Sequence, residues 1–116
     1  MILMYHRIAD EPNDPWSLAV SPAHFEEHLR VLSRTRHPLA LTEFIAKLSA
    51  GTLPPRAVAV TFDDGYVDNL TAGKPRLTAA DVPATVFLAT GFIDRREPIW
   101  WDELACLVLL EGPAKL

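Results

Sequence analysis

The sequence predicts an α/β fold built on parallel strands, and three observations support that class. Segments with strand character alternate with segments with helix character along the whole chain. The apolar runs at residues 57–62 and 84–89 lack polar alternation, as expected of strands that are covered on both faces. Start and stop residues for helices lie between the strands, so each pair of neighbouring parallel strands can be joined by a right-handed crossover.

The first strand and the first helix are expected in the first third of the chain. A short, mostly apolar run at residues 2–8 predicts a buried strand. Ser21 and Pro22 predict a helix start, because the serine oxygen can accept a free backbone N–H and the fixed φ of proline suits the first helical position. The helix should end near residues 34–36. Its apolar stripe consists of Phe25, Leu29 and Leu32.

A second helix is expected after a short extended segment at residues 39–41. Thr42 is the expected N-cap of a helix over residues 43–50. Gly51 should end this helix, because glycine readily adopts the left-handed conformation that follows a helix terminus.

The run at residues 57–62, which follows two prolines, is the expected central strand of the sheet. Residues 67–80 predict a helix after it. Gly73 and Pro75 lie inside this helix, and we expect them to divide it into two pieces.

The remaining segments are a second buried strand at residues 84–89 and a helix at residues 101–110. Gly112 and Pro113 predict the end of that helix. The single cysteine, Cys106, lies in an apolar run, so we expect it to be a buried and inert thiol.

Composition limits the size and the partners of the protein. The 116 residues, 49% of them hydrophobic, suffice for one domain with its own core but not for a complete barrel enzyme. Fifteen acidic and eleven basic residues give a formal charge of −4 without a basic stripe, so nucleic acid is not an expected partner. No run of about 18 apolar residues predicts a membrane span, and no export signal is visible, which leaves the compartment unassigned.

The candidate chemistry lies directly after the central strand, in the sequence Asp63-Asp64-Gly65. Successive side chains on a strand point to opposite faces, so two adjacent aspartates can serve one site only where the backbone turns, and Gly65 should supply that turn. Two carboxylates this close repel each other unless a cation offsets their charge. With a divalent metal, one carboxylate can ligate the ion while the other accepts a proton from water. The alternative is an exposed acidic turn without catalytic function.

The segment Val60-Thr61-Phe62-Asp63-Asp64-Gly65-Tyr66 resembles the first motif of the polysaccharide deacetylases with a NodB-type domain, the family-four carbohydrate esterases. Residues 4–8, 82–88 and 91–94 resemble further segments of that family in the same order. The resemblance implies a distorted (β/α) barrel that removes acetyl groups from N-acetylated, or sometimes O-acetylated, polysaccharides. Residues 1–116 would form the N-terminal part of such a domain, truncated where a further strand is expected.

The resemblance also assigns roles to individual residues. Asp63 matches the catalytic base of the family, and Asp64 matches a ligand of its divalent metal, usually zinc. The family completes its metal site with a His-x-x-x-His segment that follows the first motif, whereas no histidine follows Asp64 in this sequence, so we expect the isolated chain to bind metal poorly and to release no acetate. His6, near the end of the first strand, and Tyr66, beside the aspartates, are candidates for the substrate pocket; a packing role is the alternative for each.

The other histidines and tryptophans have simpler explanations. His24 and His28 are four residues apart, a spacing that can place two metal ligands on one helix face, but we interpret them as solvated helix residues. Trp100 and Trp101 could offer a platform for a sugar ring, although a tryptophan that opens an apolar helix is more often part of the core.

Two further function classes remain open. The chain could be a non-catalytic interaction module of the same fold, which docks on a partner or self-associates through an open sheet edge. It could also be a different metal-assisted hydrolase that uses the same aspartate turn.

Overall fold

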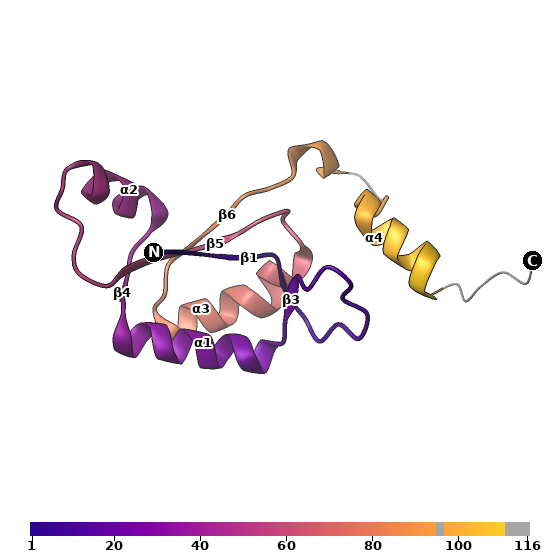
Figure 1. Cartoon of the computed structure of the whole chain (residues 1–116), viewed down its shortest axis with the longest axis horizontal. Helices are drawn as coiled ribbons and strands as arrows, with labels where there is room; N and C mark the ends of the chain where they lie inside the picture. The colour runs from indigo at the N-terminus through magenta and orange to yellow at the C-terminus, as the bar shows by residue number, and fades with distance from the viewer. Residues whose placement is uncertain (95–96, 111–116) are drawn as a thin grey trace, which may run out of the picture.

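The computed structural model describes residues 1–94 and 97–110, and its centre is a parallel β-sheet (Figure 1). The central strand, β5 (Ala57–Phe62), pairs in parallel with the amino-terminal strand, β1 (Ile2–Tyr5). It also pairs in parallel with β4 (His37–Pro38) near its start and with β6 (Ala84–Val86) near its end. This topology confirms the predicted α/β class.

Helices pack on both faces of the sheet. Helices α1 (Pro22–Thr35) and α3 (Lys74–Ala80) run side by side on one face, and α2 (Leu41–Ser49) lies on the other, near the start of β5 (Figure 1). All six residues of β5 are consequently buried, as predicted for a strand covered on both sides. The larger core cluster comprises Ile8, Phe25, Leu29, Leu32, Val58, Val60, Phe62 and Val82, and the smaller one Leu39, Phe44, Ala57 and Ala59.

Helix α1 forms where its capping residues predict it. The hydroxyl oxygen of Ser21 accepts a hydrogen bond from the backbone N–H of His24 at 3.2 Å, which confirms the predicted N-cap. The predicted apolar stripe is buried against the sheet, where Phe25 meets Phe62 edge-on.

The helix after β5 is continuous, although its geometry changes along its length. Its first turns form a π-helix, η1 (Asn69–Gly73), and the α-helical part, α3, follows without a gap. Pro75 lies in the first turn of α3, where a missing N–H is tolerated. Gly73 and Pro75 therefore do not interrupt the helix, and only its geometry changes there, from π to α.

Two boundaries differ from the prediction in the first half of the chain. The run at residues 2–8 forms two strands, because the chain leaves the sheet at His6 and β2 (Arg7–Ile8) pairs with β3 (Ala19–Val20) instead. The predicted cap at Thr42 is wrong: α2 begins two residues earlier, with Ala40 at the N-cap position and no side-chain hydrogen bond there. Gly51 has φ of +68° after this helix, as predicted.

The second half of the chain is less buried than predicted. Strand β6 ends at Val86, and Val86, Phe87 and Leu88 are exposed because, among the described residues, β6 pairs with β5 alone. Cys106 is likewise exposed, which corrects the expected buried thiol.

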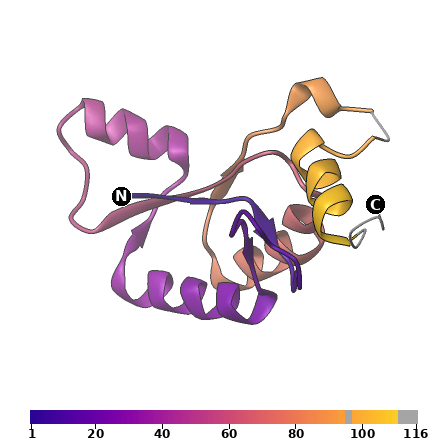
Figure 2. The same cartoon turned by 45° about the vertical axis from the view of Figure 1, so that its right-hand side comes forward.

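The last described elements are the turn η2 (Thr90–Phe92), helix α4 (Trp100–Ala105) and the π-helix η3 (Cys106–Leu110). Helix α4 lies near the carboxyl end of β5 (Figure 2) and leaves Trp100 and Leu104 exposed. Gly112 and Pro113, the predicted end of this helix, lie outside the described residues. Within the described ranges, no helix has the length and apolar character needed to cross a bilayer.

Candidate active site

The acidic turn extends directly from the carboxyl end of the central strand. The backbone N–H of Asp63 donates to the carbonyl of Tyr5 at 2.9 Å, which continues the pairing of β1 with β5 by one residue. The N–H of Gly65 then donates back to the carbonyl of Asp63 at 2.9 Å and closes the turn. The two aspartates thus lie at the edge of a parallel sheet where ligands of α/β proteins usually bind.

Two consecutive residues of this turn adopt the left-handed conformation. Asp64 has φ of +69° and Gly65 has φ of +76°, so Gly65 does not make the turn alone. The positive φ favours glycine at its position, and a Cβ there would also require the exposed side chain of Leu88 to move, because it would lie 2.7 Å from Leu88 Cδ2. Aspartate tolerates the left-handed region better than most residues do, which explains why a second glycine is not needed.

His6 and Asp64 face each other across the edge of the sheet. His6 follows β1 and Asp64 lies close behind the end of β5, so parallel pairing of the two strands places both residues at the same edge. His6 Nε2 lies 3.9 Å from Asp64 Oδ2, and each side chain is 21% exposed. This separation is too long for a direct hydrogen bond and fits an ion pair when the histidine is protonated.

Tyr66 is the point where α4 contacts the acidic turn. Its hydroxyl accepts a hydrogen bond from the indole N–H of Trp101 at 2.8 Å and donates to the carboxylate of Asp102 at 3.0 Å. Burial and the neighbouring carboxylate of Asp102 raise the pKa of Tyr66 to about 12, against a smaller opposite effect of the Trp101 N–H. The hydroxyl of Tyr66, a residue expected in the substrate pocket, is therefore engaged within the protein.

Arg7 was not singled out from the sequence, although it contacts three partners beside the turn. Its guanidinium donates to Asp68 and to Glu11, each at 3.1 Å, and lies 4.8 Å from the centre of the Tyr66 ring. Burial lowers the pKa of Arg7, but the hydrogen bond and the charge of Asp68, with that of Glu11, raise it above its ordinary value. The available signal was a charged residue inside an apolar strand segment, since a charge there needs partners.

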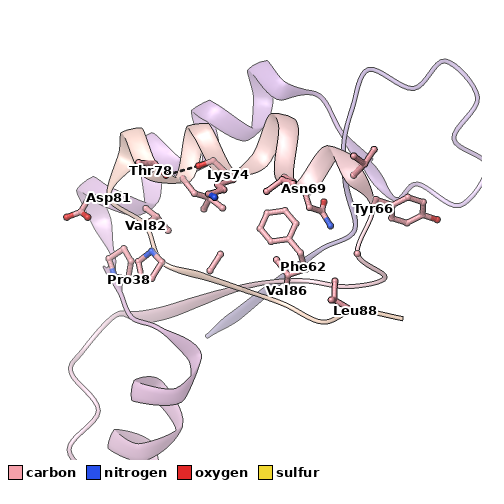
Figure 3. A pocket seen from close by; sticks show the side chains of 16 residues that line it. Pro38, Phe62, Tyr66, Asn69, Lys74, Thr78, Asp81, Val82, Val86 and Leu88 are labelled. Atoms are coloured by element: carbon pink, nitrogen blue, oxygen red, sulfur yellow. Dashed lines mark hydrogen bonds between the residues drawn. The ribbon is translucent and has the colours of Figure 1, made fainter. Parts of the chain in front are cut away.

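A groove of about 1120 Å³ runs from the acidic turn along the helix that follows it (Figure 3). One wall is formed by the helical segment from Tyr66 to Thr78 and the other by β6 and the residues after it, including Val86 and Leu88. Asn69 points into this groove from the helix, and both polar atoms of its side chain are buried without a hydrogen-bond partner among the described residues.

The residues that the structure describes do not hold a complete metal centre. Nowhere in residues 1–94 and 97–110 do three or more histidine, cysteine or acidic side chains gather as ligands. A zinc site needs three or four protein ligands, whereas only Asp64 and His6 approach each other here. His24 and His28 likewise belong to no group of three ligand side chains among the described residues, and His28 Nδ1 shares a 3.1 Å hydrogen bond with the hydroxyl of Tyr5.

These observations define a class of protein. Its members are parallel α/β domains with paired aspartates at the carboxyl edge of the central strand. Residues 50–108, a segment that contains the acidic turn, match the family model of polysaccharide deacetylases. The chain belongs to the polysaccharide deacetylase family.

Comparisons with individual proteins agree with this membership. The chain is 35% identical over 89 residues to YxkH from Bacillus subtilis (strain 168), an alignment that covers 75% of this chain and 30% of YxkH. The structure is similar to the Streptococcus pyogenes deacetylase PplD, solved in complex with acetate, with a TM-score of 0.72, 29% identity and coverage of 84% and 46%. It is also similar to IcaB from Ammonifex degensii, with a TM-score of 0.70, 25% identity and coverage of 83% and 40%. The chain thus spans less than half the length of these relatives.

Proposed function

We propose that this chain carries the catalytic aspartate turn of a metal-dependent deacetylase that acts on an N-acetylated, or O-acetylated, polysaccharide. In this proposal Asp63 is the general base and Asp64 is a ligand of the metal. The observation that carries it is the approach of His6 to Asp64, at 3.9 Å, on the ligand-binding edge of a chain that belongs to the deacetylase family.

The proposed roles of the two aspartates follow from their surroundings. Asp64 shares its edge of the sheet with a histidine, the residue type that most often accompanies carboxylates at zinc. Asp63 is partly exposed at the same turn, so its carboxylate can accept a proton from a water molecule. His6 and the ring of Tyr66 are the proposed walls of the substrate pocket, since the Tyr66 hydroxyl is already hydrogen-bonded.

The proposed metal is divalent, with zinc as the usual ion of the family, and it supplies the Lewis acidity that acetyl-group hydrolysis requires. Because two approaching side chains do not satisfy zinc, the remaining ligands must be supplied from outside the described residues. We therefore expect the 116-residue chain alone to release no acetate from an N-acetylglucosamine oligomer. Tight zinc binding in isothermal titration, or acetate release by this chain, would contradict the proposal that the remaining metal ligands lie outside the described residues.

Weak metal binding at the turn is the direct test of Asp64. Manganese(II), added to the ¹⁵N-labelled chain at millimolar concentration, should broaden the amide signals of Asp64 and His6 before others. Asp64→Asn should abolish this local broadening, while Asp63→Asn should leave most of it. The matched control is Asp81→Asn, because Asp81 is also a left-handed aspartate but lies at the end of α3. Equal broadening in the Asp64→Asn chain would refute the ligand role.

A second candidate function, a non-catalytic interaction module, is favoured by the groove and by the exposed apolar residues beside it. Val67, Leu70, Phe87 and Leu88 are all more than half exposed there. A module that docks or self-associates through this surface should form dimers or larger species in light scattering, and Leu70→Asp should return it to a monomer. The nucleotide sequence after the codon for Leu116 separates the two candidates, since a deacetylase requires a His-x-x-x-His segment there.

A further inference from the structure

Beside the acidic turn lies a cluster of side chains that has no chemical step in the proposed reaction. It consists of Arg7, Glu11, Tyr66 and Asp68, and we call it the Arg7 cluster. Arg7 donates from Nε to Asp68 Oδ2 and from Nη1 to Glu11 Oε2. Its guanidinium also lies over the ring of Tyr66, at a distance typical of a cation–π interaction.

The turn itself needs support from its surroundings. Left-handed backbone at Asp64 costs free energy, and such conformations persist only where neighbouring contacts determine them. On the strand side, the turn is held by the hydrogen bond from Asp63 N–H to Tyr5 and by the bond that Gly65 N–H makes to Asp63. On its other side, the turn leads into the start of the helix that contains Asp68, and this helix start needs its own contacts to stay in place.

Asp68 holds that helix start to the amino-terminal strands. One of its oxygens accepts the backbone N–H of Ile8 at 2.9 Å and the other accepts Nε of Arg7 at 3.1 Å. Asp68 is only 9% exposed, so these bonds to an ionised group are shielded from water and are stronger than surface ion pairs. The turn is therefore fixed between β5 on one side and the Arg7 cluster on the other.

The Arg7 cluster is connected through the backbone to both His6 and Asp64. Arg7, the first residue of β2, directly follows His6, and its partner Tyr66 lies two residues after Asp64. A displacement of the Arg7 side chain would therefore shift the backbone that carries His6 relative to the backbone that carries Asp64. A lysine could provide the charge but not the planar group that donates to two carboxylates while lying over an aromatic ring.

We propose that Arg7 is a positioning residue of the site: acting through Asp68 and Tyr66, it maintains the left-handed acidic turn and the spacing between His6 and Asp64. The importance of this spacing for deacetylation rests on the proposed function. The positioning itself is a statement about geometry and can be measured without catalysis.

Amide hydrogen exchange, followed by NMR in the 116-residue chain, tests the proposal. In Arg7→Met, protection of the Gly65 and Ile8 amides should fall about tenfold or more, which corresponds to loss of a hydrogen bond to a charged group. The amides inside β5 should keep their protection. Arg7→Lys should give an intermediate loss. Glu11→Ala is the matched control, because it removes a partner of Arg7 that does not touch the turn, and it should leave Gly65 unchanged.

Each outcome decides the proposal. An Arg7→Met chain that keeps the Gly65 protection would overturn it, and so would a uniform loss across β5, which indicates general destabilisation. If Arg7→Met does not fold, Arg7→Lys decides alone: selective loss at Gly65 and Ile8 supports positioning, and wild-type protection there overturns it. Absence of manganese broadening at Asp64 in the wild-type chain would contradict the proposed function while leaving the exchange result valid.

Discussion

The indole N–H of Trp101 donates a 2.8 Å hydrogen bond to the hydroxyl of Tyr66, two residues 35 positions apart in the sequence. The same hydroxyl donates to Asp102, so the first turn of α4 is attached to the residue that follows the acidic turn. Helix α4 has no buried side chain of its own, which makes this polar contact central to its placement. Tyr66 therefore links the amino-terminal half of the molecule to its last described helix.

Removal of the Tyr66 hydroxyl should release α4 while leaving the sheet intact. In Tyr66→Phe, the donor of Trp101 and the acceptor of Asp102 lose their partner, at a cost of about 1 kcal/mol. Amide exchange in α4 should accelerate and tryptophan emission should shift to longer wavelength. Tyr5→Phe is the control, since the hydroxyl of Tyr5 contacts His28 on α1 and not α4. Unchanged exchange in α4 would show that other contacts hold the helix.

Stability should fall between about pH 10 and pH 12 because of Tyr66. Its pKa is raised from 10.0 in the unfolded reference to about 12 in the folded protein, first by burial. The unfolded chain therefore loses this proton at a lower pH than the folded chain, and the stabilising contribution is present below pH 10 and is lost through pH 12. Urea unfolding across this range should show a smaller decline in Tyr66→Phe. The pKa of Tyr5 is also raised by burial, so urea unfolding of Tyr5→Phe measures how much of the decline in stability is due to Tyr5.

Alanine should be tolerated less well at Gly65 than at Gly51, although both glycines have positive φ. No atom lies within 4 Å of the place that a Cβ on Gly51 would take, so Gly51→Ala reports the backbone cost alone, about 1 kcal/mol. At Gly65 the added Cβ would meet Leu88 Cδ2 at 2.7 Å, so this exposed side chain must move, at a further cost of no more than about 1 kcal/mol. Urea midpoints of the two variants measure the difference, and equal midpoints would contradict this account.

Loss of the Ser21 cap should destabilise α1. Ser21→Ala removes the acceptor of the His24 N–H and should lower the free energy of unfolding by about 1 kcal/mol. Ser33→Ala is the matched control: its hydroxyl donates to the carbonyl of Arg30 inside the same helix and is exposed, so that variant should change little. If both variants lose the same stability, the cap has no special role.

The positions of most helices and strands could be predicted because they depend on local chemistry. Ser21 caps the helix that begins at Pro22, and Gly51 adopts a left-handed conformation after the second helix, each as expected from its own side chain. The uninterrupted apolar run of β5 indicated burial on both faces, and the structure confirms it. Each of these features depends mainly on residues that are close to it in the sequence.

Errors occurred where the outcome depended on partners distant in sequence. Cys106 lies in an apolar run, but α4 packs through its polar first turn, so the thiol is exposed. Phe87 and Leu88 were expected in a buried strand, yet their exposure follows from the absence of a further described strand beside β6. An apolar segment indicates which residues can be buried, while the tertiary arrangement determines whether a surface is present to bury them.

By itself, the sequence determined the α/β class, the aspartate turn after the central strand and the resemblance to polysaccharide deacetylases, because these depend on short patterns of neighbouring residues. Only the tertiary structure decided that His6 faces Asp64, that Arg7 joins Asp68 to the ring of Tyr66, and that Trp101 is bonded to the Tyr66 hydroxyl. Parallel pairing and helix packing bring these distant residues together, and such contacts leave no local pattern in one sequence.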